Sequence, residues 1–245
     1  MMKYTLDKSR SHGAFCLIAL AFVCSIVLGT VGANARADEP KAAVKFQKIL
    51  FLGNSITLHG PAPKIGWKGN WGMAASNQDK DYVHIVTRSL AKSSGVTPET
   101  MVKNIASFER QYATYDLKKN LKDAFAFQPD LVVVAIGENV LKLDSEEAKA
   151  KFKASIDQLL KELRSDNQPT IIVRSSFWSN QAKDEALRQA CEQAGGIFVD
   201  ISSLGKDEAN YARSERDYQH AGVAAHPGDQ GMQAIADAIL KVLQP

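Results

Sequence analysis

The chain has 245 residues, of which 45% are hydrophobic, 23% charged and 8% aromatic. This balance is typical of a globular protein and excludes a disordered, collagen-like or multi-span membrane chain. The 30 basic and 27 acidic residues nearly cancel. A near-neutral chain lacks the positive surface that binds nucleic acid or anionic membranes, so we expect neither as a partner.

The first 37 residues have the features of a secretory signal. Three basic residues before position 11 precede an uncharged apolar run over residues 14–31, and Ala35-Arg36-Ala37 is an A-x-A cleavage site. We expect cleavage before Asp38 and a secreted or periplasmic protein with no stable membrane insertion. An uncleaved anchor is the alternative, because the apolar run is long for a signal. The segment also holds four basic residues and one acidic residue, so the remainder is neutral.

The cysteines indicate that no internal disulfide holds the mature chain together. Cys16 and Cys24 lie in the predicted signal, which leaves Cys191 alone on a predicted helix. A single cysteine there is typical of a buried apolar residue rather than a nucleophile. Residues 38–245 must therefore be stabilised by a hydrophobic core, and their length suits one domain.

Short apolar runs rich in β-branched residues alternate with longer amphipathic stretches along this domain. The run 131–136 is apolar on both faces, which is typical of a central strand in a parallel sheet covered on both sides. The alternation predicts a three-layer α/β sandwich with a five-stranded parallel sheet. In chain order, we predict strands at 48–53, 100–105, 131–136, 170–174 and 197–201, and helices at 81–92, 115–127, 145–165, 181–194 and 230–243.

Two connections are too long and too rich in glycine, proline and aromatic residues to be plain turns. They span residues 58–79 and 202–229. Long structured loops are usually functional. The first leaves the carboxyl end of the first predicted strand, where open α/β sheets bind their ligands.

Several common motifs are absent from the sequence. No G-x-G-x-x-G follows the first strand, and there is no Walker A, H-E-x-x-H or C-x-x-C motif. The segment 53–57 also departs from the G-x-S-x-G elbow, because position 57 is Thr. We therefore expect no cofactor and no metal.

Three polar residues lie beside predicted elements at one edge of the sheet. Ser55 comes just after the first strand, Asn139 closes Gly137-Glu138-Asn139 after the third, and His226 lies just before the last helix. Each residue alone is typical of a turn or a helix cap. Their coincidence favours a catalytic site.

These segments resemble the blocks of the SGNH (GDSL-type) hydrolase family. Residues 49–57 are similar to its first block, Gly137-Glu138-Asn139 to its G-x-N block, and His226-Pro227 to the block that opens its last helix. The resemblance covers nearly all of the mature chain and implies a flavodoxin-like fold. It also implies a serine esterase with Ser55 as nucleophile, His226 as base and Asn139 as a donor to the oxyanion.

The chemistry agrees with this assignment. A serine hydroxyl needs a base to become a good nucleophile, and a histidine with an ordinary pKa of about 6.5 can serve at neutral pH. The tetrahedral oxyanion needs preorganised donors. The backbone N–H of Ser55 and the amide of Asn139 are two candidates.

The sequence departs from the family at three positions. The second block, 104–110, lacks the expected glycine, so the backbone N–H of Ser107 is our candidate donor there. The first-block Asp is Asn54, and Val223 stands where the family has the acid that orients the histidine. The remaining candidates for that acceptor are Glu109, Glu138, Asp217 or a main-chain carbonyl in 211–225, and we favour the carbonyl. Asp229 is expected to cap the last helix.

The substrate is expected to be a small acyl ester, with acetylated carbohydrate favoured. Tryptophans in the loop after Ser55 would stack on a sugar, although they serve equally well to brace the loop. The alternatives are an O-acetyltransferase, a lipase or thioesterase of the same fold, and a catalytically silent carbohydrate-binding protein. The candidate substrate-binding residues are Trp67, Asn70, Trp71, Glu109, Arg110 and Glu138.

Overall fold

The structure is a computed structural model that describes residues 45–164 and 167–243. The predicted signal and its cleavage site lie outside the described residues. Among the helices that the structure describes, none has the length and apolar character needed to cross a bilayer.

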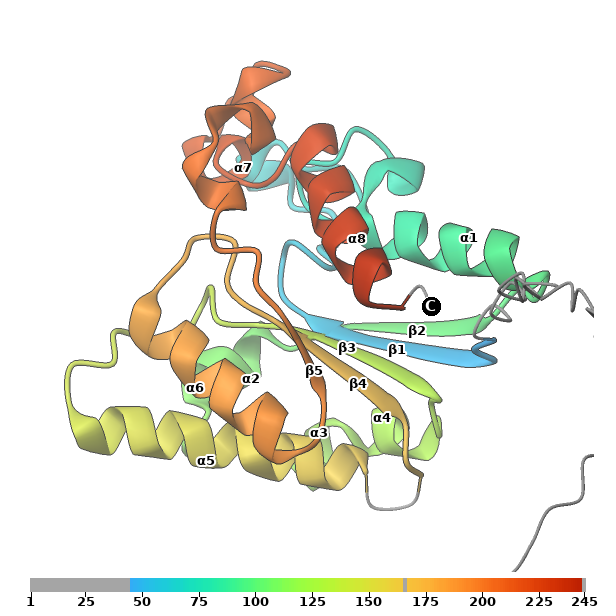
Figure 1. The fold of residues 1–245 in the computed structure, drawn as a ribbon. Coiled ribbons are helices and arrows are strands. Elements are labelled where there is room, and N and C mark those ends of the chain that lie inside the picture. The colour runs from blue at the N-terminus through green and yellow to red at the C-terminus, as the bar shows by residue number, and fades with distance from the viewer. Residues whose placement is uncertain (1–44, 165–166, 244–245) are drawn as a thin grey trace, which may run out of the picture. The chain divides into compact units, whose positions relative to one another are not determined.

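A five-stranded, all-parallel sheet lies at the centre of the fold (Figure 1). The strand order is β2-β1-β3-β4-β5. This confirms the predicted fold class, and the order is that of flavodoxin-like proteins. The strands are β1 (Lys48–Gly53), β2 (Glu99–Asn104), β3 (Leu131–Ala135), β4 (Thr170–Arg174) and β5 (Ile197–Val199).

Helices cover both faces of the sheet. Figure 1 shows α1 and α8 on one face and the helices from α2 to α6 on the other. The bounds are α1 (Tyr82–Ser94), α2 (Ala106–Gln111), α3 (Leu117–Asn120), α4 (Lys122–Ala126), α5 (Glu146–Leu163), α6 (Gln181–Gln193), α7 (Ala221–Ala224) and α8 (Asp229–Leu243).

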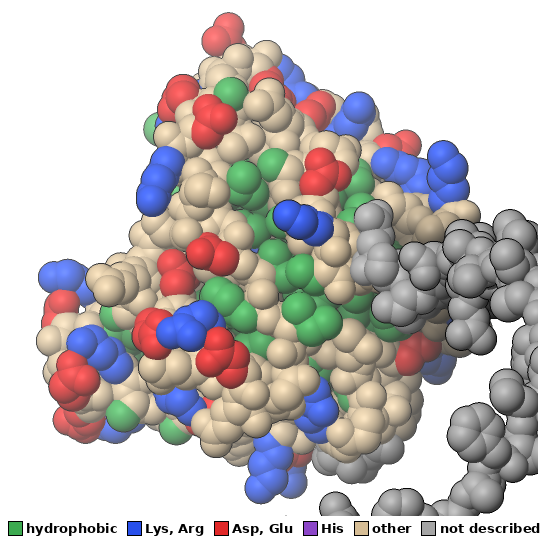
Figure 2. Space-filling model, in the orientation of Figure 1, with side chains coloured by type: hydrophobic (Ala, Val, Ile, Leu, Met, Phe, Trp, Pro, Cys, Tyr) green, Lys and Arg blue, Asp and Glu red, His purple; other side chains and the backbone are tan. Residues whose placement is uncertain are grey.

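The strands bury alternate side chains in two cores. Leu50 and Leu52 of β1 pack in the core beneath α5 and α6, whereas Ile49 and Phe51 pack in the core beneath α1 and α8. This is the period-two alternation of a strand covered on both faces. On the face seen in Figure 2, hydrophobic side chains gather in the middle, and charged side chains of both signs surround them.

Two predicted elements differ from the structure. The helix expected at 115–127 is divided into α3 and α4, because Leu121 leaves helical geometry with φ −119° and ψ 19°. The strand expected at 197–201 ends at Val199, because the N–H of Ile201 donates to the hydroxyl of Ser175 instead of to a strand.

The two long loops fold into short turns and are joined to each other. Residues 58–79 contain 3₁₀ turns at Pro63–Ile65 and Gln78–Lys80, and 202–229 contains three more. The carboxylate of Asp229 accepts hydrogen bonds from the N–H and hydroxyl of Ser76, at 2.7 and 2.6 Å. Asp229 therefore ties the first loop to α8 rather than capping that helix as expected.

The topology brings the ends of three strands together. β1 lies between β2 and β3, with Gly53 in register with Asn104 on one side and Ala135 on the other. The strand order reverses at this point, and the crevice at such a switch point is where open α/β sheets bind ligands. The segments that follow β1, β2 and β3 therefore share one edge.

Candidate active site

Ser55 lies in a tight turn directly after β1. The N–H groups of Thr57 and Leu58 both donate to the carbonyl of Asn54 at 2.9 Å, which closes the turn and directs the chain away from the sheet. The Oγ atom of Ser55 lies 2.8 Å from Nε2 of His226. Residues 171 positions apart in the sequence therefore meet at hydrogen-bond distance.

His226 is held by a main-chain carbonyl. Its Nδ1 atom lies 2.6 Å from the carbonyl oxygen of Gly222, which belongs to the segment where we favoured a carbonyl acceptor. A carbonyl only accepts hydrogen bonds, so Nδ1 carries the proton and Nε2 is free to accept the hydroxyl proton of Ser55. Val223 is a buried apolar residue beside this contact.

Burial keeps the imidazole of His226 neutral. The side chain is buried, and this lowers its pKa below the ordinary value of 6.5, although the hydrogen bond to Gly222 acts in the opposite direction. The ring of Trp178 meets the imidazole edge-on, with centroids 5.4 Å apart. At neutral pH the ring is thus unprotonated at Nε2, as a general base requires.

The side-chain amide of Asn139 is fixed from both ends. Its Nδ2 atom donates to Oε2 of Glu109 at 2.9 Å, and its Oδ1 atom accepts from Arg110 at 2.8 Å. These partners define which end of the amide is nitrogen. One N–H of Nδ2 bonds Glu109, and the second remains to serve another acceptor.

Glu109 is fully buried and does not reach the rim where a substrate would contact it. Its carboxylate accepts from the N–H of Gly137 at 2.6 Å, the N–H and Nδ2 of Asn139, and Nδ2 of Asn54. Gly137 makes this contact with φ at +125°, a conformation that glycine adopts readily. Burial and the nearby Glu138 carboxylate raise the pKa of Glu109. Its place is structural, in contrast to the substrate contact expected from the sequence.

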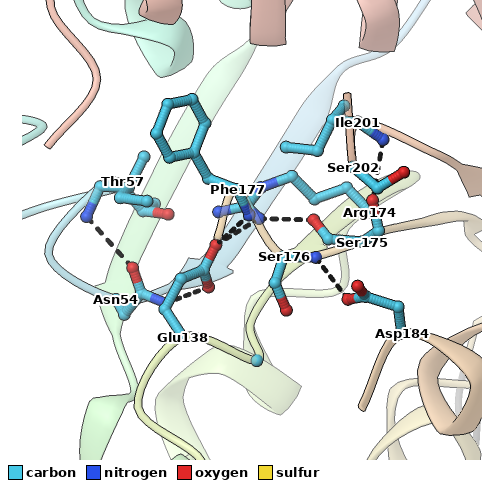
Figure 3. A network of polar contacts seen from close by, with 12 residues as sticks. Asn54, Thr57, Glu138, Arg174, Ser175, Ser176, Phe177, Asp184, Ile201 and Ser202 are labelled. Atoms are coloured by element: carbon cyan, nitrogen blue, oxygen red, sulfur yellow. Dashed lines mark hydrogen bonds and ion pairs between the residues drawn. The ribbon is translucent and has the colours of Figure 1, made fainter. Parts of the chain in front are cut away.

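Glu138 is buried too, in the network shown in Figure 3. Its carboxylate accepts from Nδ2 of Asn54, Nη1 of Arg174 and the N–H of Phe177, at 2.7, 2.7 and 2.9 Å. Burial alone would raise its pKa, but the Arg174 guanidinium and these hydrogen bonds lower it. Like Glu109, Glu138 supports the site from behind instead of contacting a substrate.

A cavity of about 480 Å³ opens beside Ser55. Of the site residues predicted from the sequence, five line this cavity: Ser55, Ser107, Arg110, Asn139 and His226. A larger hollow, of about 780 Å³, lies between α5 and α6, and neither a histidine nor a serine lines it. The cavity at Ser55 is lined by Ser55, His59, Ile65, Met73, Asn104, Ala106, Ser107, Arg110, Asn139, His220, Gly222, Val223 and His226.

Two backbone amides at this cavity are available for a ligand. Within residues 45–164 and 167–243, the N–H groups of Ser55 and Ser107 make no hydrogen bond. Both residues line the cavity. An oxygen bound there could accept from them and from Nδ2 of Asn139.

The tryptophans of the first loop brace it instead of lining the cavity. Trp67 is buried and donates to the carbonyl of His59, Trp71 donates to that of Ala75, and the two rings meet edge-on. Asn70 is exposed and also lies outside the lining. Of the two roles that the sequence left open for the tryptophans, the structure shows the bracing one.

The structure also gives roles to residues that the sequence did not single out. His59, Asn104 and His220 line the cavity, and Trp178 packs on His226. Trp178 follows β4 at the carboxyl edge of the sheet, and this position was the available signal. Asp217, a candidate for orienting His226, makes no hydrogen bond with it in the described structure.

Metal ligands and reactive thiols are not part of this arrangement. No group of three or more His, Cys, Asp or Glu side chains in the described part of the chain is placed to hold a metal ion. Cys191 is buried in α6, and burial raises the pKa of its thiol to about 11. A thiol in that environment is a poor nucleophile.

Solved structures share this fold. A GDSL-like lipase-family protein from Parabacteroides merdae matches with a TM-score of 0.54 and 20% identity, over 83% of this chain and 99% of that one. A counterpart from Bacteroides uniformis matches at 0.52 and 13%, over 80% and 94%. A two-domain esterase active on acetylated mannans matches at 0.54 and 17%, over 81% of this chain and half of that one.

The family of the chain is identified by comparing its sequence with family profiles. No curated protein matches the chain. The profile of the GDSL-like lipase/acylhydrolase family, however, matches residues 51–234, from β1 into α8. This range includes every residue of the cavity described above. The chain therefore belongs to the GDSL-like lipase/acylhydrolase family and is an ester hydrolase.

Proposed function

We propose that the protein is a serine esterase that forms an acyl-enzyme at Ser55. The observation that carries this proposal is the continuous hydrogen-bond chain from Ser55 Oγ through His226 to the carbonyl of Gly222, with contacts of 2.8 and 2.6 Å. A nucleophile, a base and an acceptor that orients the base are the parts that acyl transfer requires.

In the first half-reaction, Nε2 of His226 takes the proton of the Ser55 hydroxyl as Oγ attacks the acyl carbon. The carbonyl electron pair moves to the oxygen and gives a tetrahedral oxyanion. His226 then returns the proton to the leaving alcohol oxygen as the ester C–O bond breaks, which leaves the acyl group on Ser55.

In the second half-reaction, His226 takes a proton from water, which attacks the acyl-enzyme. The tetrahedral intermediate collapses, the bond to Oγ breaks, and His226 returns the proton to Ser55. The carboxylic acid leaves, and the starting state is restored. The imidazolium formed on the way is stabilised through Nδ1 by Gly222.

Three donors surround the expected position of the oxyanion. They are the N–H groups of Ser55 and Ser107, which make no hydrogen bond within the described part of the chain, and the second N–H of Nδ2 of Asn139. Donors fixed before the reaction stabilise the transition state without reorganising. Because Glu109 and Arg110 hold the amide of Asn139, its side chain is preorganised for this role.

The proposed substrate is a small acyl ester, acetyl above all, on a carbohydrate outside the cytoplasm. The apolar lining near Ser55 is limited to a few residues such as Ile65, Met73 and Val223, which suits a short acyl group. Polar groups on His59, Asn104 and His220 suit sugar hydroxyls. The esterase active on acetylated mannans has the same fold, so acetylated mannan is a suitable first substrate.

Steady-state kinetics of single variants test the mechanism. Ser55→Ala and His226→Ala should abolish acetate release without unfolding the protein. Asn139→Ala should lower kcat by about 100-fold, with a smaller change in KM, because the oxyanion exists only in the transition state. Equal kcat in Asn139→Ala would remove this residue from the mechanism.

A chain-length series of esters separates the alternatives. Faster turnover of octanoyl than of acetyl esters would favour a lipase or thioesterase. An acetylated product formed on adding a sugar acceptor, with little free acetate, would favour an O-acetyltransferase. A folded protein without turnover of any ester would favour a silent carbohydrate-binding protein.

A further inference from the structure

We propose that Arg110 binds an anionic group on the alcohol part of the substrate, and that the preferred substrates are acetylated acidic sugars bearing a carboxylate. This inference deepens the proposed function and rests on it. The basic character of the cavity lining was not expected from the neutral composition of the chain.

The cavity lining contains cationic and titratable basic side chains but no carboxylate. Arg110 carries a positive charge, and the other ionisable side chains of the lining are the histidines His59, His220 and His226. Glu109 and Glu138, which directly precede the lining residues Arg110 and Asn139, face the interior, where their oxygens accept from buried donors. The cavity therefore presents a positive field to whatever enters it.

Arg110 differs from the other exposed arginines in its surroundings. Arg88 and Arg213, the other exposed arginines among the described residues, each lie within 4 Å of a carboxylate. Arg110 has no carboxylate partner among the described residues, and its one side-chain hydrogen bond, from Nη2, goes to Asn139 Oδ1 at 2.8 Å. That neutral contact positions the guanidinium but leaves its charge uncompensated.

The guanidinium keeps donors for a ligand. A guanidinium has five N–H groups in a planar fork that matches a carboxylate, and the bond to Asn139 uses one of them. Ser107, one helical turn before Arg110 on α2, also lines the cavity and offers a hydroxyl. A sugar carboxylate seated there would lie beside the ester held at Ser55.

Two matched substrates test the proposal. The first is an O-acetylated methyl uronoside, and the second is its uronamide, which replaces the carboxylate by a neutral group of similar shape. We expect kcat/KM for the acid to exceed that for the amide by about tenfold at low salt, and the difference to shrink as salt is added. Because both substrates are measured on the same enzyme, any effect of Arg110 that acts through Asn139 changes both kcat/KM values equally. The ratio of the two values therefore reports only the carboxylate.

Variants assign the preference to Arg110. Arg110→Gln should reduce the acid-to-amide ratio to about one, and Arg110→Lys should keep part of it, because the charge remains while the fork is lost. Arg88→Gln, on α1 and outside the cavity, removes the same charge and should keep the ratio. Circular dichroism would verify that each variant is folded.

The possible failures are distinguishable. Equal kcat/KM for acid and amide, or a preference that survives Arg110→Gln, would overturn this inference and leave the esterase proposal standing. Absence of acetate release from both substrates and from neutral acetylated sugars would overturn the proposed function and this inference with it.

Discussion

Four hydrogen-bond donors converge on the single carboxylate of Glu109. They come from the segments after β1 and β3, so one side chain on α2 joins Asn54, Gly137 and Asn139. A carboxylate suits this position because it only accepts hydrogen bonds. We infer that Glu109 positions the amide of Asn139 without contacting the substrate.

Replacing Glu109 by Gln should therefore impair catalysis in a folded protein. The new amide nitrogen would face donors of Asn139 or Asn54, so the Asn139 side chain would lose its fixed orientation. We expect kcat to fall by about tenfold or more with little change in KM. Glu99→Gln, a surface charge removal on β2, is the control. A lower melting temperature with unchanged kcat would contradict the positioning role.

The pH dependence of kcat/KM should report His226. Burial lowers the pKa of this imidazole below 6.5, and only the neutral form can accept the proton of Ser55. Activity should thus be lost as the pH falls through a midpoint below about 6.5 and be level above it. A profile measured between about pH 4 and about pH 9 that shows no midpoint, or one above 6.5, would exclude this account of the base.

Replacing Trp178 tests the cause of the low pKa of His226 in the same pH profile of kcat/KM. Its ring packs edge-on against the imidazole of His226, with the centroids 5.4 Å apart. Trp178→Ala should admit water and move the midpoint upward, toward the ordinary histidine value. An unchanged midpoint would mean that burial by other residues, and not by Trp178, sets the pKa.

At the scale of elements, the loop 202–229 determines where His226 lies. The N–H of Ala212 donates to the carbonyl of His226, and that of Gly228 donates to the carbonyl of Asn210, both at 2.9 Å. Glu215 accepts from the N–H groups of Asp229 and Gln230, which begin α8. The loop is thereby joined to the first turn of the helix.

Glu215→Ala should destabilise the protein more than it affects catalysis. Losing the carboxylate leaves two N–H groups of α8 without their acceptor, and loss of a helix cap costs about 1 kcal/mol of the free energy of unfolding. Chemical denaturation would measure the loss. Glu208→Ala, which removes an exposed pair with Arg213 in the same loop, should have a much smaller effect. Equal losses in both variants would exclude capping.

The elements themselves were largely predictable from periodicity. All five strands begin within one residue of their predicted starts, because alternating burial leaves a strong apolar signal. The prediction of one continuous helix at 115–127 was wrong, because the apolar pattern of this segment does not reveal the break at Leu121. The short helices α2 and α7 were missed, because one or two turns are too short for a period to be visible.

At the scale of the molecule, a buried charge network joins the carboxyl ends of β1, β3 and β4. Glu138 and Arg174 are 1% and 0% exposed, with 2.7 Å between Oε1 and Nη1. Asn54 extends the network to Glu109 (Figure 3 shows its contact with Glu138). The polar groups behind the cavity are thus part of the framework of the sheet.

Breaking this pair should unfold or strongly destabilise the protein. Glu138→Ala leaves the Arg174 charge buried without its partner, and such losses cost about 3–5 kcal/mol. Combining it with Arg174→Met should recover part of the stability, because the uncompensated charge is gone. Urea denaturation of both single variants and the double variant measures the coupling. Strict additivity would contradict a direct pairing.

The sequence predicted the site only in part. Ser55, Asn139 and His226 were expected to lie together because they follow or precede strong elements at one edge of the sheet, and the structure places all three at one cavity. Glu109 and Glu138 were expected at the substrate but are buried behind the cavity, and Trp67 and Trp71, for which the sequence left two roles open, brace the first loop. A pattern of residue types does not contain the direction of a side chain in an irregular segment, and tertiary contacts decide it.

The central claim is that Ser55 is the nucleophile, activated by His226. The most direct measurement is labelling of the folded protein with a fluorophosphonate, followed by peptide mass spectrometry. We predict a single covalent adduct on Ser55, no adduct in Ser55→Ala, and much slower labelling in His226→Ala. An active, folded protein that carries no adduct, or carries it on another residue, would contradict the account.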